Sequence, residues 1–430
     1  MALELPALSA VVARLADPEI NLAAYGGIVF PLSLIVESPI IMLLAASTAL
    51  SRDWASYIKL RRFMMGAGAI LTVFHILVAF TPLYYVVARV MLGAPAEIIE
   101  PARIGLMIMT PWTWSIAYRR FNQGVLIRFG HSRAVGAGTV VRLSSNLLVL
   151  AIGYLIHSIP GIVVATSAVA TGVVSEAIYA GLRVHPVLRD ELKPAPPVEP
   201  GLTFAAFIEF YIPLVMTSLL TLLAQPIGSA ALSRMPLALE SLAVWPVISG
   251  LIFMARSLGV AYNEVVVALL DEPGAVSALR RFAALLAGLL VIFLLTIAAT
   301  PLAGLWFRDI SGLSAELTGL ARRGLWLALP MPAFAVMQSW YQGSILHSRR
   351  THSITEAVIV YLISISAMLW AGVMWGQTTG LYVGLAAMSL SSALQTAWLW
   401  WRSRTVMHAL QAGETPASRD EHRLVETAVR

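Results

Sequence analysis

The chain contains no cysteine among its 430 residues and has few charged residues for its length. The absence of cysteine excludes a disulfide framework, a Cys-based zinc site and a thiol nucleophile. Lys, Arg, Asp and Glu make up 12% of the residues, whereas hydrophobic residues make up 58%. A soluble domain of this size needs far more polar surface, because its outside faces water. The composition therefore predicts an integral membrane protein whose outer surface mostly contacts lipid.

Sequence motifs of the common enzyme classes are absent as well. The chain has no P-loop, no His-Glu-x-x-His, no Gly-x-Ser-x-Gly and no cluster of carboxylates inside an apolar segment. We therefore predict that it is not an enzyme, holds no cofactor or metal, and does not hydrolyse ATP by itself. The net charge of +6 comes from arginines in short loops, which indicates membrane orientation and no nucleic-acid partner. The first residues lack the basic region of a cleavable signal peptide.

Apolar segments long enough to cross a bilayer recur along the whole chain. A transmembrane helix needs about 20 mostly apolar residues, and helices are the only open-ended structures that satisfy their backbone in lipid. An incomplete segment lies at 1–16. The full segments lie near 22–49, 63–91, 104–127, 134–156, 161–181, 203–231, 238–270, 282–306, 324–346, 354–375 and 380–401. We predict an all-α polytopic membrane protein with about twelve transmembrane helices.

The loops between these segments alternate in charge. The less basic loops include 93–101, which carries Glu97 and Glu100. The basic loops contain Arg52, Lys59, Arg61 and Arg62; Arg128, His131 and Arg133; Arg183, Arg189 and Lys193; Arg280 and Arg281; His347, Arg349, Arg350 and His352; and Arg402 and Arg404. By the positive-inside rule the basic loops are cytoplasmic. We expect a multi-pass protein of the bacterial cytoplasmic (inner) membrane with both termini in the cytoplasm.

The chain repeats itself at a distance of 219 residues. Residues 60–124 match 279–343 without a gap, with identity at 21 of 65 positions. The identities include Arg, Pro and Gly positions that shared hydrophobicity alone does not align, among them Arg61-Arg62 with Arg280-Arg281, Thr81-Pro82-Leu83 with Thr300-Pro301-Leu302, Pro111 with Pro330, and Gln123-Gly124 with Gln342-Gly343. Six spans per half give both repeats the same orientation, so a pseudo-twofold axis along the membrane normal relates them. Transporters of this kind bind substrate between the halves.

The repeat divides the chain into four parts. We predict a first six-helix bundle over 1–182, a stiff cytoplasmic proline-rich linker over 183–202, a second six-helix bundle over 203–402, and a partly disordered cytoplasmic tail over 403–430. We expect a monomer. Residues 202–219 have no counterpart before Met1, so the first helix lacks about half of a span. We therefore expect the natural start to lie upstream of Met1.

Several motifs in the first half resemble the progressive ankylosis protein family. They are Leu22-Ala-Ala-Tyr-Gly26, Glu37-Ser-Pro39, Ser51-Arg-Asp53, Ala67-Gly-Ala-Ile70 and Val73-Phe-His75. That family belongs to the superfamily of multidrug and toxic-compound extrusion (MATE) transporters and lipid-linked oligosaccharide flippases (the MOP flippase superfamily). The resemblance implies two six-helix bundles around a cleft lined by helices 1, 2, 7 and 8, alternating access, and efflux of organic anions such as citrate or nucleotide-related phosphates.

The resemblance also bears on the coupling ion. MATE proteins usually act as antiporters that export organic cations in exchange for H⁺ or Na⁺, and commonly use an acidic residue in helix 1. This chain offers Glu4 in that helix but no aspartate. The partners we expect are a small-molecule substrate, the lipid bilayer, and H⁺ or Na⁺ as the coupling ion.

Charged residues inside apolar segments are candidates for a substrate or coupling site, because a charge at the bilayer centre costs about 2.5–3.5 kcal/mol or more. Glu37 is such a residue, and the repeat places it opposite Arg256. We expect these two residues to pair when the cleft closes and to part when it opens. Pro31 and Pro39 would loosen the helix that carries Glu37 and free carbonyls toward the cleft. Alternatively, each charge is satisfied within its own bundle.

Two further polar positions lie inside predicted spans. Arg142 is followed by polar residues up to Asn146, and an arginine there could attract an anionic substrate through bidentate contacts. The alternative is a bond within the bundle to Glu176 or Gln123. His75 could carry a proton near neutral pH, although a lone histidine on an apolar helix is more often a structural donor.

The remaining polar positions are assigned to the inner ends of the spans. Asn263 and Glu264 could gate the cytoplasmic mouth, or could simply be solvated at the interface. We expect Arg119 and Arg120 to lie near the inner interface without a special role. The repeated Gln-Gly pair is first a structural feature, because glycine permits close helix approach.

These observations leave three functions open. The first is an ion-coupled exporter of small organic anions, favoured by the resemblance, Arg142 and Arg256. The second is a MATE-like exporter of organic cations, favoured by Glu4 and Glu37. The third is a flippase for a lipid-linked precursor. In each case we expect the two bundles to rock against each other by alternating access.

Overall fold

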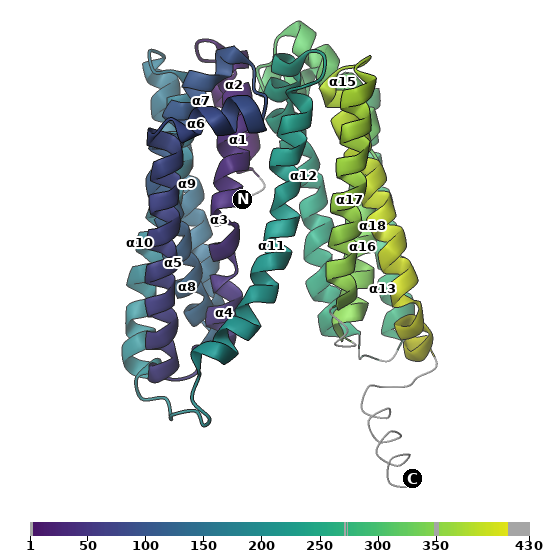
Figure 1. Cartoon of the computed structure of the whole chain (residues 1–430). Helices are drawn as coiled ribbons and strands as arrows, with labels where there is room; N and C mark the ends of the chain where they lie inside the picture. Colours follow the sequence, from purple (N-terminus) through teal and green to yellow (C-terminus); the bar gives the residue numbers. More distant parts are fainter. Residues whose placement is uncertain (1–2, 271, 273, 348–351, 412–430) are drawn as a thin grey trace.

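The structure is a computed structural model that describes residues 3–270, 272, 274–347 and 352–411. The described residues contain helices and no strand (Figure 1). The first half consists of α1 (Glu4–Val12), α2 (Pro18–Ala24), the π-helix η1 (Tyr25–Val29), α3 (Phe30–Ile41), α4 (Leu43–Leu50), α5 (Trp54–Phe80), α6 (Leu83–Tyr85), the π-helix η2 (Val86–Met91), α7 (Ala96–Ile108), α8 (Thr110–Arg128), α9 (Ser132–Ile156), α10 (Gly161–Val187) and the π-helix η3 (Leu188–Leu192). The second half consists of α11 (Phe204–Leu232), α12 (Ala238–Leu269), α13 (Ala275–Ala299), α14 (Leu302–Gly304), the π-helix η4 (Leu305–Ile310), α15 (Ala315–Ala328), α16 (Met331–His347), α17 (His352–Trp375) and α18 (Gly380–Gln411).

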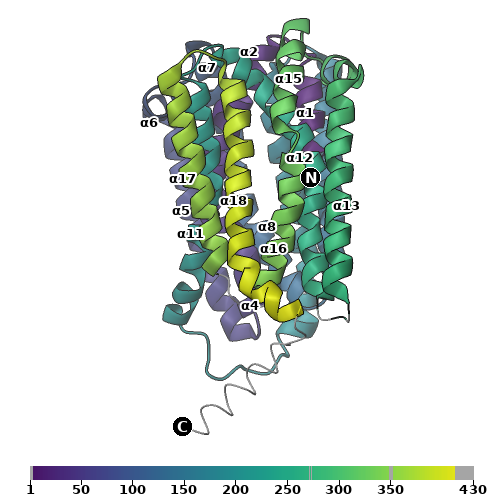
Figure 2. The same ribbon diagram turned by 90° about the vertical axis from the view of Figure 1, so that its right-hand side faces the viewer.

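The two halves form two helical bundles that stand side by side (Figures 1 and 2). Residues 193–203 join them at one end of the molecule, which we call the linker end. The opposite end, where α2 and α6 lie, is called the far end (Figure 1). The helices run between these two ends, as expected for a protein that crosses a bilayer of about 30 Å.

Within the described residues, eight helical segments are long and apolar enough to cross a membrane. They are Pro18–Leu50, Trp54–Phe80, Ser132–Ile156, Gly161–Leu192, Phe204–Leu232, Ala238–Leu269, Ala275–Ala299 and His352–Trp375. The rods formed by α7 with α8, by α15 with α16 and by α18 run alongside them, and the short α1 completes a set of about twelve. The rod of α7 and α8 carries Arg119 and Arg120 within it and breaks at Met109, so neither helix alone has the length and hydropathy of a simple span. The predicted fold class is confirmed.

Equivalent irregularities in the two halves establish the repeat in three dimensions. Both halves contain a three-residue helix followed by a six-residue π-helix, and η2 and η4 begin at Val86 and Leu305, which are 219 residues apart. Each π-helix is followed by a glycine with positive φ, Gly93 at 65° and Gly312 at 74°. Only glycine adopts this conformation without steric cost, which explains why the repeat keeps it in both halves.

One π-helix, η1, occurs in the first bundle without a counterpart in α12. Before η1 the two halves match at a spacing of 220, since Asp17 and Leu237 begin equivalent helices with positive φ of 48° and 54°. After η1 they match at 219, since Ser38 and Ser257 both donate to the carbonyl three residues earlier. A π-helix closes i→i+5 bonds and so accommodates an additional residue. The first bundle therefore carries a one-residue insertion at η1.

Two predicted spans have the wrong ends. The spans predicted over 63–91 and 282–306 stop earlier, because α5 ends at Phe80 and α13 at Ala299. Each is followed by Thr-Pro, where proline restricts the preceding residue to extended backbone and ends the helix. The chain then turns, and α6 with η2 lies across the far end of the first bundle (Figure 1).

The linker is also shorter than predicted, because α10 and η3 continue the first bundle to Leu192. The non-helical connection is held to the start of α5. The Asp53 carboxylate accepts hydrogen bonds from the N–H groups of Ser56, at 3.0 Å, and of Val198 in the linker, at 3.3 Å. Burial alone would raise the pKa of this carboxyl, but the hydrogen bonds from Ser56 and Val198 outweigh it and hold the pKa below its usual range. The predicted tail beyond Gln411 and the predicted basic-loop residues Arg349 and Arg350 lie outside the described residues.

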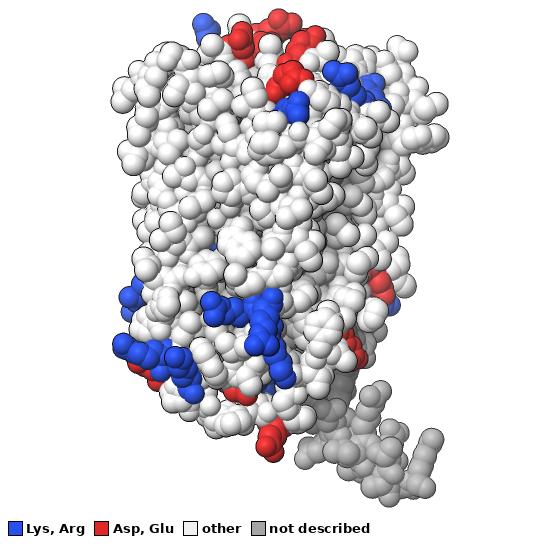
Figure 3. Space-filling view, turned by 60° about the vertical axis from the view of Figure 1, so that its left-hand side comes forward, with Lys and Arg blue, Asp and Glu red and all other residues white. Residues whose placement is uncertain are grey.

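Charged side chains on the surface separate by position. On the face shown in Figure 3 a broad central band is almost free of Lys, Arg, Asp and Glu, whereas charged residues of both signs gather at the far end and mostly basic residues gather toward the linker end. An uncharged band between two charged ends is the pattern expected of a surface embedded in lipid.

Candidate functional site

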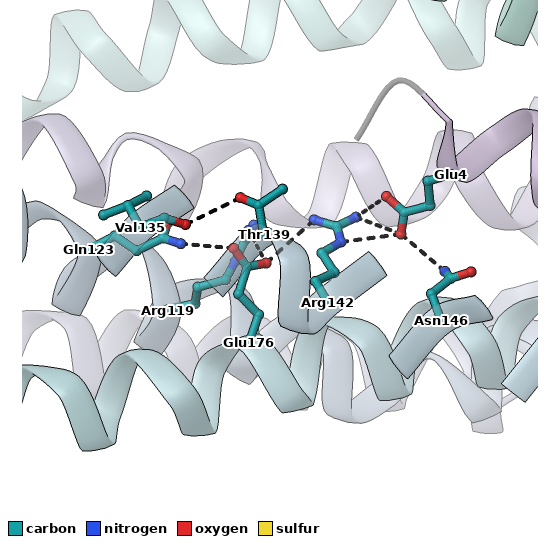
Figure 4. A network of polar contacts seen from close by, with 8 residues as sticks. All are labelled: Glu4, Arg119, Gln123, Val135, Thr139, Arg142, Asn146 and Glu176. Carbon is teal, nitrogen blue, oxygen red and sulfur yellow. Dashed lines mark hydrogen bonds and ion pairs between the residues drawn. The ribbon is translucent and has the colours of Figure 1, made fainter. Parts of the chain in front are cut away.

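A network of buried polar side chains lies inside the first bundle (Figure 4). Glu4, at the start of α1, binds the guanidinium of Arg142 on α9 in a bidentate manner, with 2.8 Å between Arg142 Nη2 and Glu4 Oε2. Asn146 Nδ2 donates to Glu4 Oε1 at 3.2 Å. Arg142 and Asn146 are four residues apart, so both project from one face of α9. The predicted candidates Glu4, Arg142 and Asn146 are thus brought together.

The network continues into α8 and α10 through Glu176. Arg119 Nη1 lies 2.6 Å from Glu176 Oε2, and Gln123 Nε2 donates to Glu176 Oε1 at 2.9 Å. Arg142 Nη1 approaches the same carboxylate at 3.8 Å, so the bond to Glu176 weighed as an alternative for Arg142 is present alongside the pair with Glu4. Glu176 is fully buried, and Arg119 is 1% exposed. Because water is excluded from this site, each charged side chain is stabilised by its ion-pair and hydrogen-bond partners, and removing one partner leaves the other charge uncompensated.

Close helix packing makes this network possible. Gly172 on α10 faces α9, and a Cβ on it would lie 3.0 Å from the carbonyl oxygen of Arg142. Gly138 on α9 faces Tyr179 and Glu176 in the same way, at 3.3 and 3.5 Å. Small residues at a helix interface let the backbones approach closely. The polar groups of α8, α9 and α10 can therefore meet without intervening side chains.

The prediction that Arg119 and Arg120 lie near the inner interface is wrong for Arg119, which is enclosed by its own bundle. Arg120 is half-buried, and its Nε has no hydrogen-bond partner among the described residues. This arrangement is not evident from the sequence alone, because Glu176 lies 57 residues after Arg119. A signal was present, since Glu176 is the lone carboxylate within the apolar segment 161–181 and a charge at that depth needs a partner.

Glu37 lies on α3 beside this network and is 4% exposed. The charged groups that act on it are Arg120, Arg119 and Arg142. Among the described residues it forms no ion pair within 4.0 Å. The first bundle therefore balances the carboxylates of Glu4, Glu37 and Glu176 against as many guanidinium groups.

Arg256 occupies the equivalent position in the second bundle, on α12. Its Nε is buried without a hydrogen-bond partner, and the group that acts on it electrostatically is the hydroxyl of Tyr361 on α17. In the described part of the chain no carboxylate pairs with it. Glu37 and Arg256 are thus equivalent by the repeat but separate in this conformation, each facing its own bundle. The predicted pairing on closure stays a prediction.

The other predicted residues take part in helix packing. His75 is 1% exposed and joins α5 to α7 and α8, with Nδ1 2.8 Å from Thr113 Oγ1 and Nε2 3.0 Å from the carbonyl oxygen of Leu106. Because a carbonyl only accepts, Nε2 carries the proton, and the geometry favours the structural interpretation. Asn263 Nδ2 donates to the carbonyl of Ser339 at 3.2 Å, while Glu264 is exposed.

Pro39 marks a contact between the bundles. The helix that contains it ends at Ile41, and its carbonyl accepts a hydrogen bond from the hydroxyl of Tyr211 on α11. The rings of Phe63, Phe207 and Tyr211 pack beside this bond, with centroids 4.6 to 5.2 Å apart. Pro39 frees the carbonyl of Ile35, four residues earlier, and that carbonyl accepts a hydrogen bond from Ser38 Oγ at 2.8 Å. The carbonyl of Pro39 itself joins α3 to α11.

Two arginines connect the bundles at the far end, and the sequence analysis missed both. Arg14, after α1, donates to the carbonyls of Asp309 and, at 2.8 Å, Ile310 at the end of η4. Arg234, after α11, donates to the carbonyls of Val90, Met91 and Leu92 at the end of η2, at 2.8 to 3.0 Å. Each arginine caps the carbonyl end of a π-helix in the other bundle, where free acceptors and the helix dipole attract a cation.

We call these two arginines, with the carbonyls that they bind, the far-end latches. Gly93 and Gly312 lie directly beneath them, since a Cβ on either would come 3.0 Å from the guanidinium of Arg234 or Arg14. The repeat pairs Arg14 with Arg234 only at a spacing of 220. A comparison at 219 is one residue out of register before η1, so it does not align them.

Comparisons with known proteins find this fold but no sequence relative. No family model and no curated protein matches the chain. The inward-facing form of a multidrug resistance MATE family transporter of the MOP superfamily is 15% identical with a TM-score of 0.73, and the match covers 96% of both chains. The lipid II flippase MurJ in an inward closed conformation is 14% identical with a TM-score of 0.73, over 96% of this chain and 88% of that one.

A third solved structure is a MOP superfamily transporter from Pyrococcus furiosus described by the reverse polarity of its binding pocket. It is 15% identical with a TM-score of 0.62, over 95% of both chains. At these identities the comparisons show a common fold. The part of the sequence resemblance that concerns the MOP fold is therefore confirmed, and membership of the progressive ankylosis family stays a prediction.

Proposed function

We propose that this chain is a secondary transporter that exports a small organic anion, a carboxylate or a phosphate-bearing metabolite, by alternating access between its two bundles. The observation that carries the anionic substrate is Arg256, a half-buried cation whose Nε is buried without a hydrogen-bond partner and for which the described second bundle provides no carboxylate. An uncompensated guanidinium in the membrane is costly unless a ligand or a moving group neutralises it in part of the cycle. Its planar donors suit a carboxylate or phosphate.

The contacts between the bundles support a rocking motion. At the far end the latches join side chains of one bundle to backbone carbonyls of the other, and such bonds can break without unfolding either bundle. Toward the linker end the contact is made by α11 with α3, including the bond from Tyr211 to Pro39. Two separate sets of contacts at the two ends are what alternating access requires, because one set opens while the other holds.

We propose that the linker end faces the cytoplasm of a bacterial cell and that the protein works as a monomer in the inner membrane. The basic residues at the start of α5, at the end of α8 and in η3 lie toward that end (Figure 1), in agreement with the positive-inside rule. For coupling we propose Glu37, a buried carboxylate that the described residues leave without an ion pair. It could exchange H⁺ or Na⁺ while Arg120 and Arg119 act on it from one side.

The second candidate function is a MATE-like exporter of organic cations, and the same unpaired Glu37 favours it. Glu4 at the start of α1 is the acidic residue of the first helix that this function would use, but Arg142 already neutralises it. A flippase for a lipid-linked precursor is the third outcome. It would require the anion held at Arg256 to be a pyrophosphate attached to a lipid.

The test compares metabolites exported by cells that express the wild type, Arg256→Gln or Glu37→Gln. Arg323→Gln serves as the control, because it removes an exposed arginine from the same half. We expect one di- or tricarboxylate or phosphate ester to accumulate in the medium with the wild type and the control, and to fall strongly with either test variant. A charge-swapped Glu37→Arg, Arg256→Glu protein should recover in part if the two residues pair during the cycle.

Equal export by all variants would refute the role of both residues. Absence of any exported anion, with efflux of a cationic dye that depends on Glu37, would favour the cation exporter. A change in the distribution of lipid-linked precursors would favour the flippase.

A further inference from the structure

A cavity of about 490 Å³ opens at the linker end of the first bundle, between α5, α8 and the junction of α10 with η3. Its buried floor is aromatic. The ring centroids of Trp54 and Tyr57 lie 5.2 Å apart, and those of Tyr57 and Phe121 lie 5.4 Å apart. A cavity of this volume, with apolar walls and a few polar groups, has the dimensions of a small-molecule site.

The rim of this cavity is basic, and none of the described residues that line it is acidic. Arg61, His185, Arg189 and Lys193 surround the opening. Arg189 is neutralised by Asp190, with 2.6 Å between Nε and Oδ1. By contrast, Arg61 forms no ion pair with a described residue, and Lys193 lies over the ring of Trp54 at 5.1 Å. The rim therefore offers two cations that no protein carboxylate neutralises within the described chain.

An apolar groove continues from this cavity along the outside of the bundle. A second cavity of about 360 Å³ shares Tyr118 and His185 with the first and lies between α8 and α10. It reaches from His185 to Val174, which is about 16 Å along α10 at 1.5 Å per residue. Ile178 and Leu182 on its edge are 58% and 67% exposed, as side chains that face lipid should be. The groove thus runs from the membrane surface into its apolar interior.

We propose that the two cavities together bind one anionic phospholipid. The phosphate of its headgroup lies between Arg61 and Lys193 above the aromatic floor, and one acyl chain follows the groove past Tyr118. Basic pockets between transmembrane helices at a membrane surface attract phosphate headgroups electrostatically. A free phosphate ester would use the basic rim but leave the groove empty, so the continuity of the two cavities selects a lipid. α10 lies at the edge of the first bundle farthest from the second, so this site is distinct from the proposed substrate path (Figure 1).

The position of the site gives the lipid a structural consequence. Lys193 directly follows η3 and is the first residue of the chain that joins the bundles. A headgroup held between Lys193 and Arg61 would therefore attach the start of the linker to α5, next to the hydrogen bond that Asp53 makes to Val198.

The experiment measures lipid retained by the full chain in detergent, by native mass spectrometry, during titration with phosphatidylglycerol or with phosphatidylcholine of the same acyl chains. We expect one molecule of phosphatidylglycerol to be retained and phosphatidylcholine to be lost. Arg61→Gln with Lys193→Gln should weaken retention at least about tenfold, because each basic residue near the headgroup contributes to anionic-lipid affinity. The matched control, Arg62→Gln with Arg183→Gln, removes two positive charges from the same region without touching either cavity.

A charge-neutral variant tests the groove. In Gly181→Ala the new Cβ would lie 2.6 Å from Tyr118 Oη, so the side chain that lines both cavities must move. We expect this variant to weaken retention of phosphatidylglycerol, even where the double charge variant is too unstable to measure.

Glycerol 3-phosphate, the headgroup fragment without chains, distinguishes the two sources of phosphate. It should not displace the lipid at millimolar concentration. Displacement that depends on Arg61 and Lys193 would overturn the proposal in favour of a soluble phosphate site. Equal retention of both lipids, or equal retention by the charge variant and its control, would overturn it altogether.

Discussion

Removal of the far-end latches should open the end of the molecule opposite the linker. Arg14 donates to two carbonyls of the second bundle and Arg234 to three carbonyls of the first. A hydrogen bond from a charged donor contributes about 1.5–3 kcal/mol in a buried setting. Both arginines are exposed, so water competes for their donors, and we take about 1–2 kcal/mol for each whole side chain.

These magnitudes translate into populations. Arg14→Ala or Arg234→Ala should each lower the ratio of far-end-closed to far-end-open molecules about 5- to 30-fold. The two latches bind different segments and share no partner, so their effects should add to about 2–4 kcal/mol in the double variant, roughly 30-fold or more. Arg89→Ala is the matched control. It removes a guanidinium from the same end that stacks on Tyr85 of its own bundle, at 5.0 Å, and that makes no hydrogen bond or ion pair to a described residue of the other bundle.

The assay is the distance between two spin labels across the far end, in lipid. The chain contains no cysteine, so labels attach only at the introduced pair Glu97→Cys and Glu316→Cys. These positions are exposed and equivalent by the repeat, one on α7 and one on α15. We expect a longer distance to gain population in the latch variants and not in Arg89→Ala. The test requires conditions in which the wild type shows both the short and the long distance. If the double variant then has the same ratio of the two populations as the wild type, the reasoning is refuted.

Three further predictions concern the buried network, the glycine contacts and the linker. Arg119→Met removes the partner that lies 2.6 Å from the buried Glu176 carboxylate, so the unfolding free energy in detergent should fall by about 3–5 kcal/mol. Adding Glu176→Gln should restore much of the lost stability. An unchanged melting temperature in the Arg119→Met variant would contradict this prediction. Gly124→Ala places a Cβ 2.5 Å from the carbonyl oxygen of Leu44 and should cost about 1–3 kcal/mol, whereas Gly66→Ala, with nothing within 4 Å, should leave the melting temperature unchanged or raise it. The pKa of Asp53 is depressed in the folded protein, so its bond to Val198 should be fully present above the ordinary carboxyl pKa of about 4, and be lost only as pH falls through the lower pKa of the folded state. The hydrogen-exchange rate of the Val198 amide measures this loss. In Asp53→Asn, which keeps the helix cap, the Val198 amide should exchange fast at every pH.

The sequence predicted those parts of the fold that depend on hydropathy and on the repeat. The spans at 134–156, 203–231 and 354–375 agree closely with α9, α11 and α17, because long apolar runs in lipid have few alternatives to a helix. The span predicted over 380–401 begins where α18 does, but α18 continues to Gln411. The repeat places Glu37 opposite Arg256, and the neighbouring Ser38 and Ser257 both donate to the carbonyl three residues earlier, as equivalent positions should. The errors at Phe80 and Ala299 arose because hydropathy does not change where a helix turns to lie across the membrane surface.

The buried network could be predicted only in part. Glu4, Arg142 and Asn146 stood out as polar residues in apolar segments, and they do meet. Arg119 did not stand out, because its polar neighbours Arg120, Asn122 and Gln123 resemble an interface when read in one dimension. Whether an arginine faces solvent or a carboxylate on another helix depends on the rotation of each helix in the bundle, which a single sequence does not determine.

The single extra residue in η1 has a consequence for the phase of the helix that contains it. One residue turns an α-helix by about 100°. The insertion in η1 therefore rotates the side chains that follow it, up to Leu50, relative to those that precede it from Pro18 on. The far-end part points Asn21 at the N–H of Ile162, 2.9 Å away, while the part beyond the insertion presents Glu37 to the arginines of α8. Deleting Gly27 would force both parts into one phase, and only one of these two contacts could survive. Ser241 and Arg256 in the other bundle share one uninterrupted helix, so a chimera built from two copies of either half would not reproduce the interface that the two different halves form together.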